Sequence, residues 1–163
     1  METNQVKAIL IGAGQRGAQV YGAFARRNPN DIVFVAVAEP DKARREEFCR
    51  DHGICPENAV EDWHELLARP QMADCAFVCT QDNQHIAPAM AALQAGYHVV
   101  MEKPMSRNAD ELRELKALAE EKGKLVTVCH VLRYTPFFSK VKELLDAGEI
   151  GQLQSVQQIE NVA

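Results

Sequence analysis

The sequence predicts an α/β protein built on a doubly wound parallel sheet. Short apolar runs alternate with segments of helical periodicity along most of the 163 residues, as expected when each strand is followed by a helix that packs on the sheet. The run Ile32–Ala38 is apolar throughout, which is typical of a strand buried on both faces. The glycine spacing Gly12-x-Gly14-x-x-Gly17 lies directly between the apolar run Val6–Ile11 and a helical pattern, the context of a strand–turn–helix unit.

Composition and charge are typical of a soluble globular protein. The chain is 47% hydrophobic and 25% charged with a net charge of −5, so neither a disordered nor a strongly basic class is indicated. No basic run points to nucleic acid as a partner, and no apolar stretch approaches the ~18 residues needed to span a bilayer. The first residues lack the basic segment of a signal peptide. We therefore expect a cytoplasmic protein that binds neither nucleic acid nor membranes.

The five cysteines indicate neither a disulfide framework nor a metal centre. Cys75, Cys79 and Cys129 lie in apolar strand runs, where a thiol behaves as a small buried hydrophobic group. The segment Cys49–Cys55 holds two cysteines and a histidine, but no second pair of ligands accompanies it elsewhere. We therefore expect no bound metal.

The glycine segment predicts a dinucleotide-binding turn. Gly12 permits the tight turn, Gly14 lets a pyrophosphate approach the backbone, and Gly17 lets the helix pack closely on the strand. The start of that helix presents N–H groups and the positive end of its dipole to phosphates. The alternative is a glycine-rich turn that serves packing alone. The turn residues predicted to bind the cofactor are Gly12, Ala13, Gly14, Gln15, Arg16 and Gly17.

An acidic residue follows the second strand at the expected distance. Glu39 lies 22 residues after Gly17, where a dinucleotide fold places a carboxylate that accepts hydrogen bonds from the adenosine ribose. The same carboxylate would repel a 2′-phosphate, which favours NAD over NADP. A strand-end glutamate in solvent is the alternative reading. The nearby cations of Lys42, Arg44 and Arg45 could still tolerate the extra phosphate, so NADP stays open.

The other elements follow in order along the chain. The helix after the turn is expected to bury Gly17, Val20, Tyr21 and Phe24 on one face, and Trp63 is interpreted as part of a helical core face. The remaining predicted helices are Asp41–His52, Trp63–Ala68 (capped by Asp62), a helix that follows the polar loop Thr80–His85 and runs to about Ala95, and one from the cap Asn108 to Gly123 (with Glu111 at capping-box spacing). The remaining predicted strands are Asn58–Val60, Cys75–Cys79, His98–Met101 and Leu125–Cys129. Six strands of this kind favour the order 3-2-1-4-5-6 with right-handed crossovers.

The character of the chain changes after the sixth strand. We predict one domain over residues 1–131 and the start of another over 132–163. Thr135 is a candidate cap for a helix that begins at Pro136, shows an apolar face and ends at Gly148. Gln152–Glu160 partly alternates polar and apolar residues, as a half-exposed strand does. We interpret it as the first strand of a second domain whose remainder the sequence does not contain.

Ligands of open α/β sheets bind beyond the carboxyl ends of the strands. This rule brings together the glycine turn, the polar loop Thr80–His85 and the segment Glu102–Pro104. Lys103 then supplies an ammonium near the nicotinamide end, where a lysine can hydrogen-bond a substrate hydroxyl and help to move its proton. A surface lysine after a strand is the alternative. Arg133, beyond the sixth strand, is a further candidate for orienting cofactor or substrate.

Several motifs occur in one order and resemble those of the Gfo/Idh/MocA family of oxidoreductases. They are the glycine turn, the Thr80-Gln81-Asp82-x-x-His85 loop, Gly96-Tyr97-His98 leading to Glu102-Lys103-Pro104, Arg133-Tyr134 and Gly148-Glu149-Ile150-Gly151. The resemblance implies an NAD(P)-dependent oxidoreductase acting on a sugar, cyclitol or related polyol, with Lys103 as the catalytic lysine and a cis bond before Pro104. It also implies assembly as a homo-oligomer when full length. The cofactor contacts it adds are Thr80, Gln81, Asp82, His85, Glu102, Lys103 and Arg133.

Two departures from the family pattern limit what this chain is expected to do. The loop reads Thr80-Gln81-Asp82 where many relatives have Thr-Pro-Asn. The acidic residue and histidine that relatives carry in their second domain lie beyond Ala163, so we expect cofactor binding without appreciable turnover. The alternative functions are a non-catalytic NAD-binding module or subunit, and an NAD-dependent glycosidase of the same family.

Overall fold

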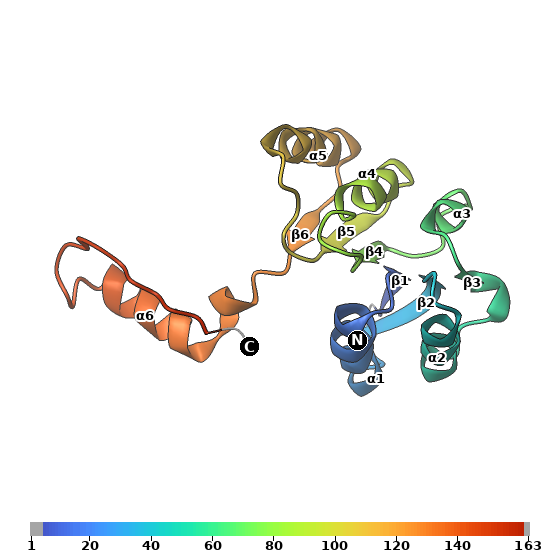
Figure 1. Cartoon of the computed structure of the whole chain (residues 1–163), viewed down its shortest axis with the longest axis horizontal. Helices are drawn as coiled ribbons and strands as arrows, with labels where there is room; N and C mark the ends of the chain where they lie inside the picture. Colours follow the sequence, from blue (N-terminus) through green and yellow to red (C-terminus); the bar gives the residue numbers. More distant parts are fainter. Residues whose placement is uncertain (1–4, 162–163) are drawn as a thin grey trace. The chain divides into compact units, whose positions relative to one another are not determined.

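The computed structural model describes residues 5–161 and contains one parallel sheet. The strand order β3-β2-β1-β4-β5-β6 confirms the predicted doubly wound arrangement (Figure 1). Every pairing is parallel, so all six carboxyl ends meet at one edge. The strands are β1 (Val6–Ile11), β2 (Ile32–Ala38), β3 (Ala59–Val60), β4 (Cys75–Val78), β5 (His98–Met101) and β6 (Val126–Val128).

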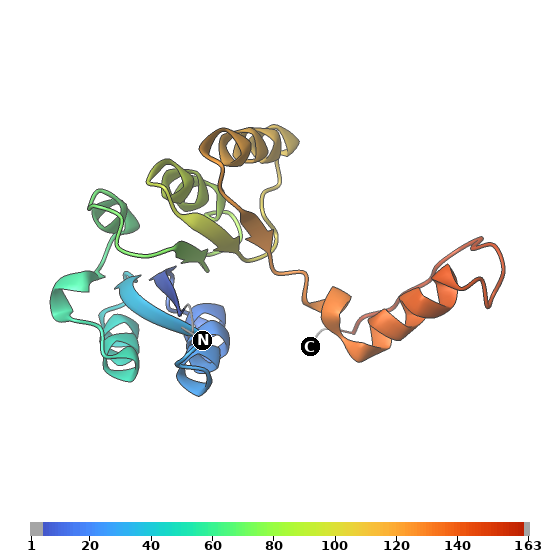
Figure 2. The same cartoon turned by 180° about the vertical axis from the view of Figure 1, so that it is seen from behind.

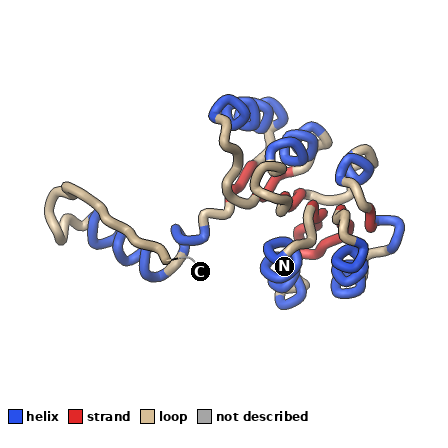
Figure 3. The backbone as a smooth tube through the Cα atoms, viewed as in Figure 1, coloured by secondary structure: helices blue, strands red, loops and turns tan. Residues whose placement is uncertain are grey.

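Helices cover both faces of this sheet, as Figures 2 and 3 show. Alternate residues of β1 point to opposite faces: Ile9 and Ile11 join the core beneath α3, α4 and α5, whereas Ala8 and Leu10 join the core beneath η1, α1 and α2. The helices are η1 (Gln15–Gly22), α1 (Ala23–Arg27), α2 (Lys42–His52), η2 (Pro56–Asn58), α3 (Trp63–Leu67), α4 (Ile86–Gln94), α5 (Ala109–Lys122), η3 (Val131–Tyr134) and α6 (Pro136–Asp146).

The predicted buried face of the first helix is wrong in part. Val20 and Phe24 are exposed, and the buried positions are Gly17, Gly22 and Ala25. The reason is that η1 is wound as a π-helix, whose i→i+5 hydrogen bonds widen each turn. The buried stripe therefore recurs at a longer interval than the α-helical period used to predict it.

Side-chain caps define three of the helix starts. Asp41 and Asp62 accept hydrogen bonds from the backbone N–H groups of Arg44 and His64, and the cap at Asp62 was predicted. Asn108 caps α5 as expected, but Glu111 does not complete the capping box. Its carboxylate accepts a hydrogen bond from the Ser106 hydroxyl instead, and Ser106 in turn accepts one from the Asn108 N–H.

The chain divides into two compact units, Met1–Cys129 and His130–Ala163. The domain boundary predicted between residues 131 and 132 lies close to this division. In the second unit, Pro136 begins α6 as expected, but the Thr135 hydroxyl donates to the Leu132 carbonyl and does not cap the helix. The predicted strand Gln152–Glu160 is wrong: these residues are exposed coil, and no strand among residues 5–161 pairs with them.

No helix in the described range 5–161 is long and apolar enough to cross a bilayer. Within the same range, no cluster of three or more His, Cys, Asp or Glu side chains is arranged to hold a metal ion. The prediction that the chain begins without a signal peptide concerns the first residues, of which residues 1–4 lie outside the described part. All five cysteines are free thiols. Cys75 lies in β4 and is buried, and this burial raises the pKa of its thiol to about 11. The prediction of a buried strand position is wrong for Cys79 and Cys129, which follow the last residues of β4 and β6 and are half-buried.

Candidate dinucleotide-binding site

The glycine turn has the geometry that a dinucleotide requires. Gly12 adopts φ +95°, and a Cβ there would lie 2.6 Å from the Cys79 carbonyl oxygen. A Cβ on Gly17 would lie 2.1 Å from the Gly12 oxygen, so only glycine allows this approach of helix and turn. A Cβ on Gly14 would meet no atom within 4 Å, because this residue faces open space. The predicted roles of the first and third glycines are therefore confirmed, and the second leaves room for a pyrophosphate.

Glu39 is fixed at the end of β2 by the turn that it faces. Its carboxylate accepts hydrogen bonds from the backbone N–H groups of Ala13 at 2.6 Å and Asp41 at 3.0 Å. The residue is only 6% exposed, so the alternative reading of a glutamate free in solvent does not apply. Each carboxylate oxygen receives one donor and keeps a further lone pair, which a ribose hydroxyl can use.

A groove of about 900 Å³ runs along the carboxyl edge of the sheet. It joins the glycine turn to the end of β2, to the first residues of α3 and to the loop after β4. The predicted site residues that line it are Gly12, Gly14, Gln15, Arg16, Glu39, Thr80 and Gln81. The predicted site residues of the first unit that do not line it are Ala13, Gly17, Asp82, His85, Glu102 and Lys103.

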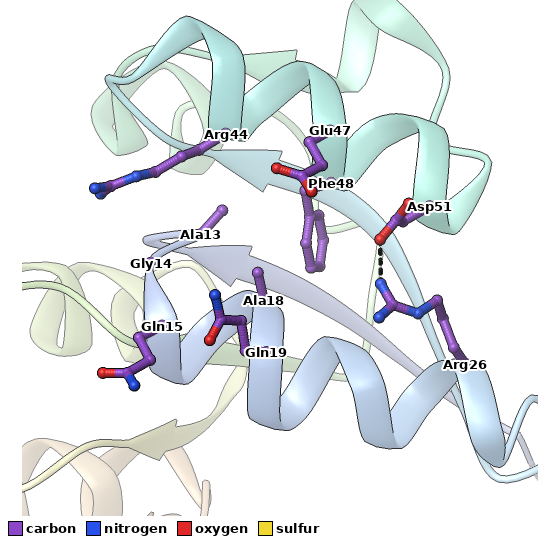
Figure 4. Close-up of a pocket in the computed structure, with 10 residues that line it drawn as sticks. All are labelled: Ala13, Gly14, Gln15, Ala18, Gln19, Arg26, Arg44, Glu47, Phe48 and Asp51. Atoms are coloured by element: carbon purple, nitrogen blue, oxygen red, sulfur yellow. Dashed lines mark hydrogen bonds and ion pairs between the residues drawn. The ribbon is translucent and has the colours of Figure 1, made fainter.

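A second pocket of about 410 Å³ adjoins this groove between η1 and α2. Ala13 and Gly14 line it at the turn, and Figure 4 shows Phe48 of α2 directed into it. Arg26 and Asp51 close the far end through an ion pair. Arg44 lines both this pocket and the larger groove, as do Gly14 and Gln15.

Glu102 is turned into the protein and not toward the groove. Its Oε1 accepts hydrogen bonds from Arg16 Nε at 2.9 Å and from the Tyr21 hydroxyl at 2.7 Å. Burial raises the pKa of this carboxyl, but the hydrogen bonds from Tyr21 and Arg16 outweigh burial and hold the pKa below its usual value. Arg16 also donates to Cys129 Sγ at 3.4 Å, so this thiol is more than a packing group. The network links the glycine turn to the ends of β5 and β6.

His85 joins the two loops that follow β4 and β5. It is 1% exposed, and its Nδ1 lies 2.7 Å from the Pro104 carbonyl oxygen while Nε2 lies 3.0 Å from the Thr80 oxygen. A neutral imidazole carries one N–H, so the ring donates to one of these two carbonyl oxygens, and its tautomer decides which one. The predicted proximity of the Thr80 loop and the Glu102–Pro104 segment is therefore realised through this ring.

Lys103 follows β5 at the same edge and is exposed. In the described part of the chain its ammonium has no hydrogen-bond or ion-pair partner, so it remains available to a ligand. The bond between Lys103 and Pro104 is cis, as the family resemblance implies. Asp82 is exposed in the loop after β4. Arg133 lies in η3 of the second unit, where it is also exposed.

Sequence reasoning missed the aromatic part of the groove. Trp63, interpreted as a core residue, packs against the core and also lines the groove next to His64. The two rings are stacked with centroids 3.5 Å apart. The sequence signal was the position of these residues directly after β3, whose carboxyl end meets the same edge as the glycine turn.

A glycine turn between β1 and a helix, with a fixed carboxylate at the end of the adjacent strand, defines a dinucleotide-binding Rossmann domain. The sequence comparison agrees with this class. The chain belongs to the Gfo/Idh/MocA oxidoreductase family, whose NAD-binding Rossmann-fold model matches residues 6–130.

Curated relatives are similar over most of this chain. A scyllo-inositol 2-dehydrogenase (NADP(+)) of Bacillus subtilis is 30% identical over 157 residues, which is 96% of this chain and 42% of the relative. A trans-1,2-dihydrobenzene-1,2-diol dehydrogenase of Oryctolagus cuniculus is 38% identical over 120 residues, 74% of this chain and 36% of the relative. The chain thus spans less than half the length of these relatives.

Solved structures of the same fold also match most of this chain over less than half of their own length. A 3-ketoreductase from Actinomadura kijaniata in complex with NADP has a TM-score of 0.78 at 26% identity, over 91% of this chain and 46% of its own. An inositol dehydrogenase homologue from Azotobacter vinelandii, complexed with NADH and myo-inositol, has a TM-score of 0.77 at 26% identity, over 91% and 41%. These structures confirm the predicted fold class.

Proposed function

We propose that this chain is the cofactor-binding part of an NAD(P)-dependent oxidoreductase that transfers a hydride between nicotinamide and a CH–OH group of a sugar, cyclitol or related polyol. The observation that carries the proposal is the placement of the glycine turn, Glu39 and the Lys103 segment at one edge of a single parallel sheet. Inositol and diol dehydrogenases among the relatives, and a neighbour solved with NADH and myo-inositol, support this substrate class.

The residues at this edge fit a dinucleotide. Gly14 faces open space on the groove, and no side chain caps η1, so the first N–H groups of this helix are offered to phosphate oxygens. The Glu39 carboxylate is already oriented by Ala13 and Asp41, which lowers the ordering cost of binding the ribose. When bound, the nicotinamide ring supplies the hydride acceptor or donor. The remaining tasks fall to the chain's own side chains.

Lys103 is the residue to which we assign the substrate hydroxyl. Its ammonium donates a hydrogen bond to that oxygen and stabilises the negative charge that develops as the hydroxyl proton passes to the second-domain histidine that the family resemblance implies. His85 contacts the adjacent Pro104 carbonyl, so its ring links the backbone that carries Lys103 to the loop after β4. Thr80, Gln81 and Asp82 of that loop are proposed cofactor contacts, as are Glu102 through Arg16 and, from the second unit, Arg133.

The contacts that the basic residues after β2 make within the protein favour NAD over NADP as the cofactor. Arg45 donates to the backbone carbonyls of Glu39 and Pro40, and Lys42 pairs with Glu46 at 3.8 Å. Arg44 alone of the three lines the groove, beside the carboxylates of Glu39 and Asp41. A 2′-phosphate brings up to about two negative charges, and one guanidinium does not offset two carboxylates at this range.

The proposal extends to the whole protein in two respects. Assembly as a homo-oligomer when full length and a cytoplasmic location are both consistent with the family resemblance. The absence from residues 5–161 of a helix that could cross a bilayer is compatible with that location.

A calorimetric titration with NADH and, separately, NADPH tests the proposal. We expect the wild type to bind NADH more tightly than NADPH. In Glu39→Gln the two affinities should lie closer together, because the substitution removes the carboxylate charge that repels the 2′-phosphate. Lys103→Met should retain most of the NADH affinity, because Lys103 is one of several proposed cofactor contacts and its main assigned role is toward the substrate hydroxyl. Failure of both nucleotides to bind would reject a cofactor-binding domain.

A further inference from the structure

The first residues of α3 place a stacked aromatic pair on the groove. Trp63 and His64 have ring centroids 3.5 Å apart and an interplanar angle of 23°. They are the only aromatic side chains among the described residues that line this groove. The pair is therefore the aromatic part of an otherwise polar and aliphatic groove lining.

The pair is held in place before any ligand arrives. Trp63 is half-buried and packs against the core cluster that covers one face of the sheet. His64 stacks on Trp63, and its Nδ1 lies 2.7 Å from Oδ1 of Asp62, which also accepts a hydrogen bond from the His64 backbone N–H. The His64 side chain is 68% exposed, so the outer side of the pair is open to a planar ligand.

The position of the pair follows from the order of groups in a dinucleotide. The pyrophosphate belongs at Gly14 and the adenosine ribose at Glu39, so the base must extend beyond Glu39 along the same groove. β3 lies next to β2 in the sheet, and the Glu39 N–H donates to the Val60 carbonyl, so the residues after β3 adjoin the ribose position. Trp63 and His64 begin α3 directly after that strand.

We propose that the Trp63–His64 pair receives the adenine base of the cofactor by stacking. This inference rests on the proposed function, and it assigns the adenine end of the groove to residues that no motif of the family resemblance includes. Every purine offers a π face to an aromatic ring, and such stacking needs no hydrogen bond to the base edge. Asp62 orients the histidine ring and is a positioning residue.

Trp63 is the single tryptophan of the chain, so its fluorescence reports directly on this site. ADP-ribose carries the adenine, both phosphates and the ribose but no nicotinamide, whereas nicotinamide mononucleotide lacks the adenine. We expect saturating ADP-ribose to quench Trp63 emission and nicotinamide mononucleotide to leave it unchanged. Neither probe absorbs where tryptophan emits, so quenching reports a ligand bound at the stacked pair and not energy transfer to a reduced nicotinamide.

Calorimetry on variants measures what the pair contributes. Trp63→Leu keeps an apolar side chain against the core but removes the ring, and His64→Ala removes the outer ring. Each is expected to weaken ADP-ribose binding about 5- to 150-fold, the equivalent of about 1–3 kcal/mol for one stacked base. Trp63→Phe and His64→Phe preserve an aromatic face and should retain most of the affinity. Glu65→Ala, on the same helix and away from the groove, is the matched control.

The outcomes separate this inference from the proposed function. Quenching by ADP-ribose together with weaker binding in Trp63→Leu and His64→Ala supports the adenine site. Unchanged ADP-ribose affinity in both folded variants, with NADH still bound by the wild type, overturns the adenine site alone. Failure of the wild type to bind NADH or ADP-ribose overturns both the inference and the proposed function.

Discussion

Two helices with similar amphipathic patterns have opposite surroundings. In α5 of the first unit, Leu115 is 1% exposed and joins the core under the sheet. In α6 of the second unit, Leu144 is 40% exposed and no residue of the helix is buried. The pattern predicts that each segment is helical, and both are. An amphipathic pattern does not say which other part of a protein covers the apolar face of the helix. Within the described residues, that face is buried for α5 and exposed for α6.

The largest effect is expected where the first unit is packed most closely. Gly17→Ala puts a Cβ 2.1 Å from the backbone oxygen of Gly12, and neither backbone segment can move without disturbing the turn. We expect the free energy of unfolding to fall by about 4 kcal/mol or more. Urea denaturation followed by circular dichroism measures this change.

Gly14→Ala is the matched control for that prediction. Its Cβ meets nothing within 4 Å, and Gly14 has φ −76°, which alanine also adopts. We expect stability within about 0.5 kcal/mol of the wild type but a clear loss of NADH affinity, since the methyl group occupies the phosphate position. Equal destabilisation by Gly17→Ala and Gly14→Ala would show that the close contact between Gly17 and the Gly12 oxygen is not the reason why Gly17→Ala destabilises the protein.

His85→Leu should produce the next largest effect. The substitution removes the ring N–H, so one of the two carbonyl oxygens of Thr80 and Pro104 loses its donor. We expect a loss of about 2 kcal/mol in unfolding free energy, since each unmatched buried acceptor costs about 1–3 kcal/mol. His130→Ala, at an exposed histidine of the second unit, should change stability by less than about 0.5 kcal/mol. Similar losses of unfolding free energy for His85→Leu and His130→Ala would show that the buried histidine of the first unit stabilises the protein no more than the exposed histidine of the second.

Much of the first unit could be predicted because its signals are local. The order of the strands follows from their alternation with helices, and Gly12, Gly17 and Glu39 were found from spacing along the chain. The inward orientation of Glu102 could not be found in this way, because its partners Arg16 and Tyr21 belong to a distant helix. The groove face of Trp63 was missed for a similar reason: its helical pattern indicates burial and carries no information on the neighbouring loops.

A half-buried histidine predicts a smaller, pH-dependent effect in the first unit. Burial lowers the pKa of His52 from 6.5 and the charge of Arg26 lowers it further, while its Nε2 has no hydrogen-bond partner in the described structure. Since the folded-state pKa lies below the unfolded one, the neutral ring contributes its full stability above pH 6.5. That contribution is lost as the pH falls through the folded-state value.

Denaturation midpoints measured from about pH 8 to about pH 5, where histidine titrates, test this prediction. The wild type should lose stability on acidification, and His52→Leu should lose less because no half-buried ring remains to be protonated. His64→Leu, which removes an exposed ring, should follow the wild-type dependence. Parallel curves for the wild type and His52→Leu would assign the acid sensitivity to other groups.

The smallest effect is expected on the exposed apolar face of α6. Leu144→Ala removes a side chain that is 40% exposed, so little buried area is lost and the free energy of unfolding should change by less than about 0.5 kcal/mol. Leu115→Ala in α5 is the matched reference, with an expected cost of about 2–5 kcal/mol. Both changes delete the same atoms from a leucine in a helix. The difference between their losses of unfolding free energy therefore measures the contribution of packing around Leu115. A large cost at Leu144 would mean that α6 is covered in solution.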